Sequence, residues 1–164
     1  MIFVTVGTHE QQFNRLIKYI DSMVKCGKIR EKVIIQSGFS TYKPKYCDFK
    51  EIIPYTELIE NIKKARIVIT HGGPATFIMP LQFGKIPVVV PRRKKFDEHV
   101  NDHQFEFAKM VEKKQRNIIL VKDIEELIGV LEDYEEIVKK MPNKIIKNND
   151  NFNKNLKRII NELV

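Results

Sequence analysis

The sequence has no tryptophan, only two cysteines, and no apolar run as long as a membrane helix. Cys26 and Cys47 are too few and too far apart for a disulfide framework or a paired-cysteine zinc site, which favours a cytosolic protein with reduced thiols. Spanning a bilayer takes roughly 18 or more consecutive apolar residues, and no such stretch is present. The opening MIFVTVGTHEQQ lacks a basic leader and a small-residue cleavage site, so we expect a first strand there rather than a signal peptide.

Several motifs that hold phosphates or metal ions are also missing. The sequence contains neither GxxxxGK[ST] nor GxGxxG, which argues against a P-loop nucleotidase and a typical dinucleotide dehydrogenase. It has no Asp-x-Asp element of the kind that holds a divalent cation against a diphosphate. His99 and His103 lie one helical turn apart, but no third ligand is evident. We therefore expect neither a metal ion nor a cofactor.

Size and charge set broad limits. A chain of 164 residues fits one domain, since single cores usually form at roughly 100–200 residues. The net charge of +8 suits a polyanion, a membrane surface or an acidic partner. A composition rich in lysine and asparagine gives the same charge without a dedicated binding patch, so charge alone does not decide the function.

Short apolar strands alternate with amphipathic helices along the chain. The expected strands are 2–6, 33–35, 50–53, 67–69, 87–90 and 118–121. The expected helices are 13–24, 57–65 capped by Thr56, 75–83, 98–114, and one that Asp123 caps and that ends near 131. This alternation predicts an α/β fold, a Rossmann-like parallel sheet with helices on both faces.

We place this domain at residues 1–138. Residues 139–164 are expected to form an Asn- and Lys-rich linker and an amphipathic C-terminal helix. That helix either covers the sheet or crosses to a partner protein.

Two strand ends carry glycine directly before a helix. Gly7 follows the strand at 2–6, and Gly72 and Gly73 follow the strand at 67–69. Ligands of such sheets bind beyond the carboxyl ends of the strands, where glycine lets the backbone approach and helix N-termini attract negative charge. The hydroxyls of Thr8 and Thr76 can add donors. The run that begins at His71 and ends at Thr76 predicts an anion site, whereas Gly7 alone fits a plain tight turn more simply.

A third polar cluster precedes and begins the helix at 98–114. Its members offer hydrogen-bonding groups to hydroxyls: Glu98, His99, Asp102, His103 and Gln104. The alternative interpretation is a capping Asp97 followed by a solvated helix face. The basic run 92–95 just before it could pair with phosphates or lie near an anionic membrane.

These motifs together resemble a known family. The run THGGPATFIMPLQFGKIPVVVPRRKKFDEHVNDHQFEFA resembles the C-terminal, donor-binding domain of GT-B glycosyltransferases of family 28. The opening FVTVGTHEQQFNRLI resembles the start of a stand-alone version of that domain. Within the family, the chain is similar to small subunits of two-component transferases. These include the dolichol-pathway UDP-N-acetylglucosamine transferase and bacterial enzymes of capsule or exopolysaccharide synthesis.

The resemblance implies inverting transfer of a hexose from a UDP-sugar donor to a lipid-linked saccharide acceptor. The family's diphosphate loop matches Gly72, Gly73 and Thr76, with His71 preceding them, and its first glycine loop matches Gly7 and Thr8. The family's donor-sugar contacts match His103 and Gln104, beside the loop that carries Asp97, Glu98 and His99.

One position departs from the family. Members often carry a glutamate three residues after the loop threonine, where it binds ribose hydroxyls, and here that position is Met79. Pro80 follows it, which suggests that the helix begins later than residue 75, because proline fits only a first turn or a kink.

A GT-B enzyme needs two facing Rossmann-like domains, and this chain has the length of one. The resemblance therefore implies a membrane-anchored subunit that binds the acceptor and recruits this chain from the cytoplasm to the inner face of the membrane. His9 is the local candidate for the general base, because a histidine pKa lies near neutrality. The alternatives are a non-catalytic UDP-sugar-binding scaffold and a nucleic-acid-binding module. No nucleic-acid motif is recognisable, so we expect no nucleic-acid partner.

Overall fold

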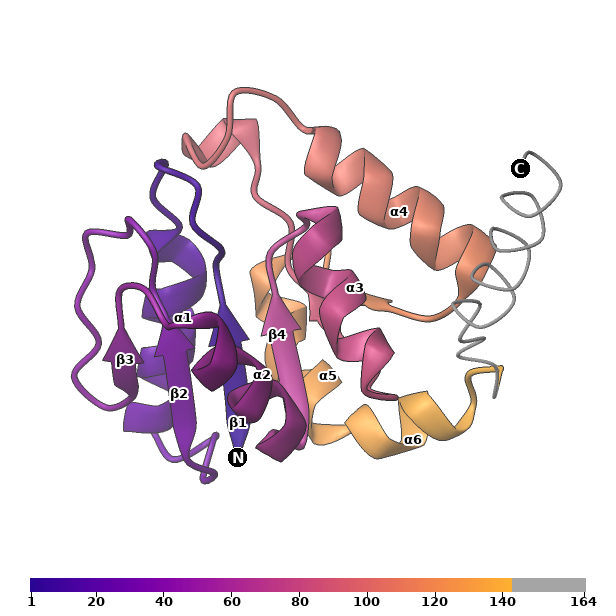
Figure 1. Cartoon of the computed structure of the whole chain (residues 1–164), viewed down its shortest axis with the longest axis horizontal. Coiled ribbons are helices and arrows are strands. Elements are labelled where there is room, and N and C mark those ends of the chain that lie inside the picture. The colour runs from indigo at the N-terminus through magenta and orange to yellow at the C-terminus, as the bar shows by residue number, and fades with distance from the viewer. Residues whose placement is uncertain (143–164) are drawn as a thin grey trace, which may run out of the picture.

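The structure, a computed structural model, describes residues 1–142, and its centre is a parallel sheet (Figure 1). The sheet has six strands in the order β3-β2-β1-β4-β5-β6, and every neighbouring pair is parallel. The strands are β1 (Ile2–Thr5), β2 (Val33–Gln36), β3 (Asp48–Lys50), β4 (Ile67–Thr70), β5 (Val88–Val89) and β6 (Ile119–Leu120). This order is that of the Rossmann fold, which confirms the predicted fold class.

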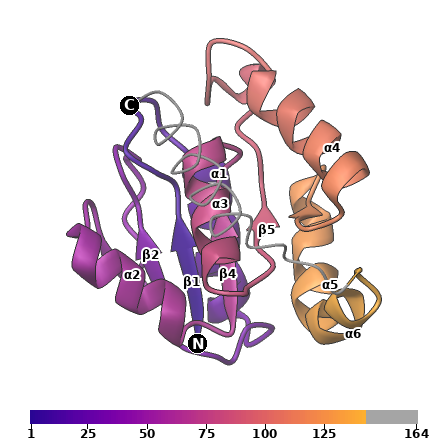
Figure 2. The same ribbon diagram turned by 45° about the vertical axis from the view of Figure 1, so that its right-hand side comes forward.

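Helices cover both faces of the sheet (Figures 1 and 2). Alternation along β1 separates two cores: Val4 packs with α1 and α5 residues, and Phe3 packs with α2 residues on the other face. A third cluster joins α3 and α4 to the strands β5 and β6. The helices are α1 (Asn14–Lys25), α2 (Tyr55–Lys64), α3 (Pro74–Gln82), α4 (His103–Gln115), α5 (Leu127–Glu132) and α6 (Tyr134–Lys139).

The edge strand β3 lies two residues before the predicted 50–53. Register places Asp48 and Lys50 opposite Ile34 and Gln36 of β2. An edge strand is wetted on one side, so its sequence Asp-Phe-Lys lacks the apolar run that marks the buried strands. The apolar pair that suggested a strand here instead leads into the Pro54 turn before α2.

Two capping predictions, for Thr56 and Asp123, are wrong, and so is the alternative interpretation of Asp97 as a cap. Helix α2 begins at Tyr55 directly after Pro54, so Thr56 lies inside its first turn. Asp123 precedes a 3₁₀ turn, η2 (Ile124–Glu126), and makes no side-chain cap. Asp97 has a left-handed backbone (φ 54°) after a second 3₁₀ turn, η1 (Lys94–Phe96), and α4 begins only at His103.

Helix α3 begins at Pro74, and the expected later start is wrong. Pro74 occupies the first helical position, where the missing N–H is of no consequence. Pro80 lies inside the last turns of the same nine-residue helix. The glycine turn after β4 therefore does precede a helix, as the sequence pattern predicted.

Part of the C-terminal prediction lies outside the described residues. Helix α6 ends at Lys139, and the predicted linker is described only from there to residue 142. The predicted amphipathic helix lies outside the described residues. Within residues 1–142, no helix is long and apolar enough to cross a membrane.

Candidate functional site

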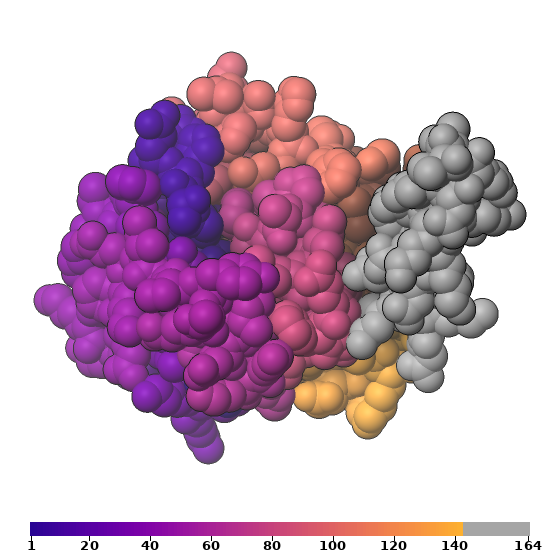
Figure 3. All heavy atoms as spheres, in the orientation of Figure 1, coloured from indigo at the N-terminus to yellow at the C-terminus, as the bar shows by residue number. Residues whose placement is uncertain are grey.

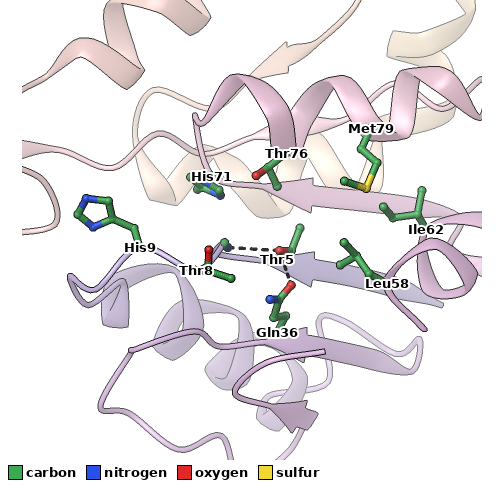
Figure 4. A pocket seen from close by; sticks show the side chains of 10 residues that line it. Thr5, Thr8, His9, Gln36, Leu58, Ile62, His71, Thr76 and Met79 are labelled. Atoms are coloured by element: carbon green, nitrogen blue, oxygen red, sulfur yellow. Dashed lines mark hydrogen bonds between the residues drawn. The ribbon is translucent and has the colours of Figure 1, made fainter. Parts of the chain in front are cut away.

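A pocket opens at the carboxyl ends of β1 and β4, where the strand order changes direction. The chain leaves β1 for α1 on one face of the sheet and leaves β4 for α3 on the other, and such divergence opens a crevice. The pocket has a volume of about 370 Å³. Its lining, drawn in Figure 4, consists of Thr5, Gly7, Thr8, His9, Gln36, Leu58, Ile62, His71, Thr76 and Met79.

A polar row crosses three neighbouring strands at the pocket, and two of its members, Thr5 and Gln36, form the pocket floor. Gln36, Thr5 and Thr70 end β2, β1 and β4, and the register places them side by side. Thr5 Oγ1 donates to Gln36 Oε1 at 2.9 Å and accepts the Gly7 N–H at 3.3 Å (Figure 4). With its oxygen held in this way, Gln36 keeps its NH₂ group for a ligand. Sequence motifs did not predict this row, although each of these strands is apolar except for a polar residue near its end.

The His71 imidazole fills the space between the two glycine turns. A Cβ atom at Gly7 or Gly73 would lie 2.4 Å from an atom of this ring, so only glycine fits at either position. Burial, assisted by the Arg92 charge, lowers the pKa of His71 to about 4, so the ring is neutral at neutral pH. His71 Nδ1 is buried and has no hydrogen-bond partner within residues 1–142.

Both glycine turns present backbone N–H groups without acceptors. Amides that lack an acceptor among the described residues are those of Thr8, His9 and Glu10 after β1, and those of Gly72, Gly73 and Ala75 at the start of α3. The helix dipole of α3 adds partial positive charge at its N-terminus. The Thr76 hydroxyl lies in the same first turn and lines the pocket. This arrangement suits an anion with several oxygens.

Two histidines meet at the mouth of the pocket. The His9 and His99 rings lie 5.1 Å apart between centroids. His9 Nδ1 accepts the Gln11 N–H at 3.2 Å, and His99 Nδ1 accepts the Asn101 N–H at 3.4 Å. Partial burial and the neighbouring His9 lower the pKa of His99. The structure thus joins the first glycine loop to the polar cluster that the sequence placed far away.

The two residues that match the family's donor-sugar contacts lie at the start of α4. Gln104 packs against the glycine turn after β4, since a Cβ on Gly72 would lie 2.8 Å from its Cβ. Gln104 Oε1 accepts the Arg92 N–H at 3.3 Å, which leaves its NH₂ group available. His103 is exposed, and its backbone N–H is held by Asn101 Oδ1 at 3.1 Å.

Glu98 and Asp102 are engaged with neighbouring cations and amides. The Glu98 side chain is almost fully buried, and its carboxylate accepts the Nε and Nη2 donors of Arg15, both at 2.9 Å. It also accepts the Arg93 N–H at 3.0 Å, so this is not the arrangement of a sugar contact. Asp102 accepts the Lys94 N–H at 3.0 Å and Arg93 Nε at 3.2 Å, and these interactions lower its pKa.

The basic run 92–95 is divided by the fold. Arg92 is 0% exposed and reaches neither a phosphate in the pocket nor a membrane surface, so that expectation is wrong for it. Lys94 and Lys95 are exposed. Among residues 1–142, no group of three or more His, Cys, Asp or Glu side chains is placed to hold a metal ion.

Comparisons with known proteins agree with the family resemblance seen in the sequence. Residues 1–163 match the model of the glycosyltransferase family 28 C-terminal domain. The chain is 33% identical to the human, and 32% to the mouse, "UDP-N-acetylglucosamine transferase subunit ALG13", each over 121 residues. These matches cover 68% of this chain but only 10% of each relative, so the chain spans about a tenth of their length.

Among solved structures, the glycosyltransferase SnogD from Streptomyces nogalater is similar with a TM-score of 0.45 and 16% identity. This match covers 81% of the present chain and 43% of SnogD, and it is too distant to carry an argument.

Proposed function

Because the chain belongs to the glycosyltransferase family 28 C-terminal domain family, we propose that it is the nucleotide-sugar-binding subunit of a two-component inverting glycosyltransferase. The donor is a UDP-sugar, and a hexose passes to a lipid-linked saccharide in capsule or exopolysaccharide synthesis. A separate membrane-anchored subunit binds the acceptor and recruits this chain to the cytoplasmic face of the membrane. The name of the mammalian relatives, subunits of a UDP-N-acetylglucosamine transferase, supports the donor and the need for a partner.

The observation that carries the proposal is that both glycine turns beside the pocket have backbone amides without acceptors among residues 1–142. Thr8 and His9 line the pocket on one side and Thr76, in the first turn of α3, lines it on the other, so we place a diphosphate between the two turns. The Thr76 hydroxyl and the α3 dipole add to these amides. Charge grows on the diphosphate as the glycosidic bond breaks, and fixed donors of this kind stabilise such a leaving group. Loss of one typically costs about 10²–10³ in rate.

The inner half of the pocket suits the nucleoside. Leu58, Ile62 and Met79 form an apolar wall, and Gln36 offers its NH₂ group from the floor. Met79 faces the pocket where many family members have the ribose-binding glutamate, so a thioether stands in place of a carboxylate. We propose that Gln36 supplies a nucleoside hydrogen bond in this chain.

The outer side of the site faces the donor sugar and the acceptor. His99 lies beside the His9 ring, and Gln104, which follows His103 in the chain, lies beside Gly72. We propose that the sugar attached to the diphosphate lies on this side. His9 stands at the mouth, so it can accept a proton from an acceptor hydroxyl if the partner supplies no base. The acceptor itself requires the second subunit.

Calorimetric titration of UDP into the isolated chain tests the donor site. Wild type should bind, and Thr76→Ala should weaken binding about tenfold, because a hydrogen bond to a charged group contributes about 1.5–3 kcal/mol. Thr56→Ala is the matched control, since Thr56 also lies in the first turn of a helix but does not line the pocket. Equal affinities of the two variants would contradict the assignment.

The transfer reaction requires co-expression with the membrane-anchored subunit. A panel of UDP-sugars and a lipid-linked acceptor should show transfer that depends on both proteins. Binding of UDP without transfer in the presence of the partner would identify the chain as a scaffold instead.

A further inference from the structure

Arg92 is a fully buried cation that spans two loops of the site. Its Nη1 donates to the carbonyl oxygens of Gln11 and Gln12, both at 2.8 Å, and to that of Glu98 at 3.2 Å. Its Nη2 donates to the carbonyl oxygen of Val6 at 3.0 Å. Val6 directly precedes Gly7, and Gln11 and Gln12 end the same loop. One guanidinium thus holds both ends of the first glycine loop.

Through its hydrogen bond to the Glu98 carbonyl oxygen, Arg92 also contacts the segment 93–102, which carries His99. Gln12 Nε2 also crosses to this segment, donating to the Phe96 carbonyl oxygen at 3.1 Å. The Arg92 backbone N–H donates to Gln104 Oε1, so the same residue also touches the start of α4. Figure 3 shows the loop after β1, in indigo, beside this segment at the top of the molecule.

A second cation extends the contact. Arg15 of α1 makes the paired hydrogen bonds to Glu98, and its guanidinium lies 4.6 Å from the Phe96 ring centroid. Phe13 lies beside both cations, with its centroid 4.9 Å from the Arg92 guanidinium and 5.4 Å from that of Arg15. The result is one network of charges and aromatic rings, buried at Arg92, Glu98 and Phe13 and exposed at Phe96.

Burying the Arg92 charge costs free energy of desolvation, which an apolar side chain at this position would avoid. Burial lowers the pKa of Arg92 to about 10, so the group stays charged at neutral pH without contact with water. Its Nε has no partner within residues 1–142. Apolar residues of similar volume are often as stable as a buried ion pair. What an apolar residue cannot do is bind the carbonyl groups of Val6, Gln11 and Gln12, which accept no other hydrogen bond among the described residues.

We propose that Arg92 is a positioning residue of the donor site. It fixes the loop 7–13 against the segment 93–102, and so holds the free amides of Thr8 and His9 and the ring of His99 in a binding geometry. Arg92 itself touches no ligand. The inference rests on the proposed function for the identity of the ligand, but the clamp is a property of the chain alone.

Arg92→Lys separates the charge from the geometry, because an ammonium group cannot reach four carbonyl oxygens at once. At a temperature well below the unfolding midpoint, exchange of the hydrogen-bonded backbone amides in 7–13 and 93–102, such as those of Gly7, Phe13 and Arg93, should rise about tenfold or more, with exchange in the sheet unchanged. The affinity for UDP should fall by about tenfold in the same folded protein. Arg30→Lys is the control, since Arg30 is exposed and bonds only the Gly27 carbonyl oxygen.

A residue that only stabilises the fold would give a different result. Arg92→Lys would then lower the unfolding midpoint, while loop exchange and UDP affinity stayed at the wild-type values, and this outcome overturns the proposal. If wild type does not bind UDP, the proposed function fails, and the exchange measurement still decides the role of Arg92. If Arg92→Lys does not fold, Arg92→Gln is the second variant, because its shorter side chain has one NH₂ group in place of the guanidinium that binds four carbonyl oxygens. Exchange in 7–13 should rise in that variant too, and unchanged exchange overturns the proposal.

Discussion

Alanine at position 73 should destabilise the protein only while the His71 ring is present. Gly73 has φ −72° and ψ 126°, a conformation that alanine adopts without strain, but its Cβ would lie 2.4 Å from His71 Nε2. Overpacking of this kind costs about 1–3 kcal/mol. In a His71→Ala background the ring is absent, and two small effects of Gly73→Ala remain. Alanine is a poorer N-cap than glycine, which destabilises the protein, and it lowers the entropy of the unfolded chain, which stabilises the protein by a similar amount. The cost of Gly73→Ala should then fall to within about 0.5 kcal/mol of zero.

The stability cost of Gly7→Ala gives a second test of packing against the His71 ring. Its Cβ would also meet His71 at 2.4 Å, but its φ is +74°. Left-handed strain of roughly 1 kcal/mol therefore remains after the ring is removed. Gly27→Ala is the matched control, because Gly27 has the same φ of +74° and no atom within 4 Å of an added Cβ. It should cost roughly 1 kcal/mol with or without the ring.

Urea unfolding followed by circular dichroism gives the free energy of unfolding of each single and double variant. The double-mutant cycle between positions 71 and 73 should yield a coupling of about 1–3 kcal/mol. The packing argument is refuted if Gly73→Ala costs the same free energy in both backgrounds. A coupling between Gly27 and His71 would contradict it as well.

Two further predictions concern the same pocket. The pKa of His71 is about 4 in the folded protein against 6.5 in the unfolded chain, so only the unfolded state binds this proton between those values. Stability should therefore fall as the pH drops from 6.5 to about 4, by up to roughly 3 kcal/mol, and His71→Asn should flatten this part of the urea-midpoint profile. Gln36→Leu should weaken UDP binding about tenfold in calorimetry and cost about 1 kcal/mol of stability, because the Thr5 hydroxyl loses its acceptor. An unchanged affinity would place the nucleoside elsewhere.

Local sequence patterns predicted correctly those elements that depend on residues adjacent in the chain. Buried β-branched runs marked β1 and β4, and the glycines after them marked the turns at the pocket, because both signals come from adjacent residues. Patterns failed at β3 and at the start of α4. The edge strand lacks an apolar run, and the polar residues at 97–102 form a turn held by distant groups.

The sequence by itself determined an α/β domain with glycine turns at its strand ends, since strand and helix periodicity is written in the order of residues. Only the tertiary structure decided which polar groups meet. The pairing of β1 with β4 brings Gly7 and Gly73 against one His71 ring, and the packing of α1 brings Arg15 to Glu98. These contacts join residues far apart in the chain, and their geometry depends on strand order and register, which no local pattern specifies.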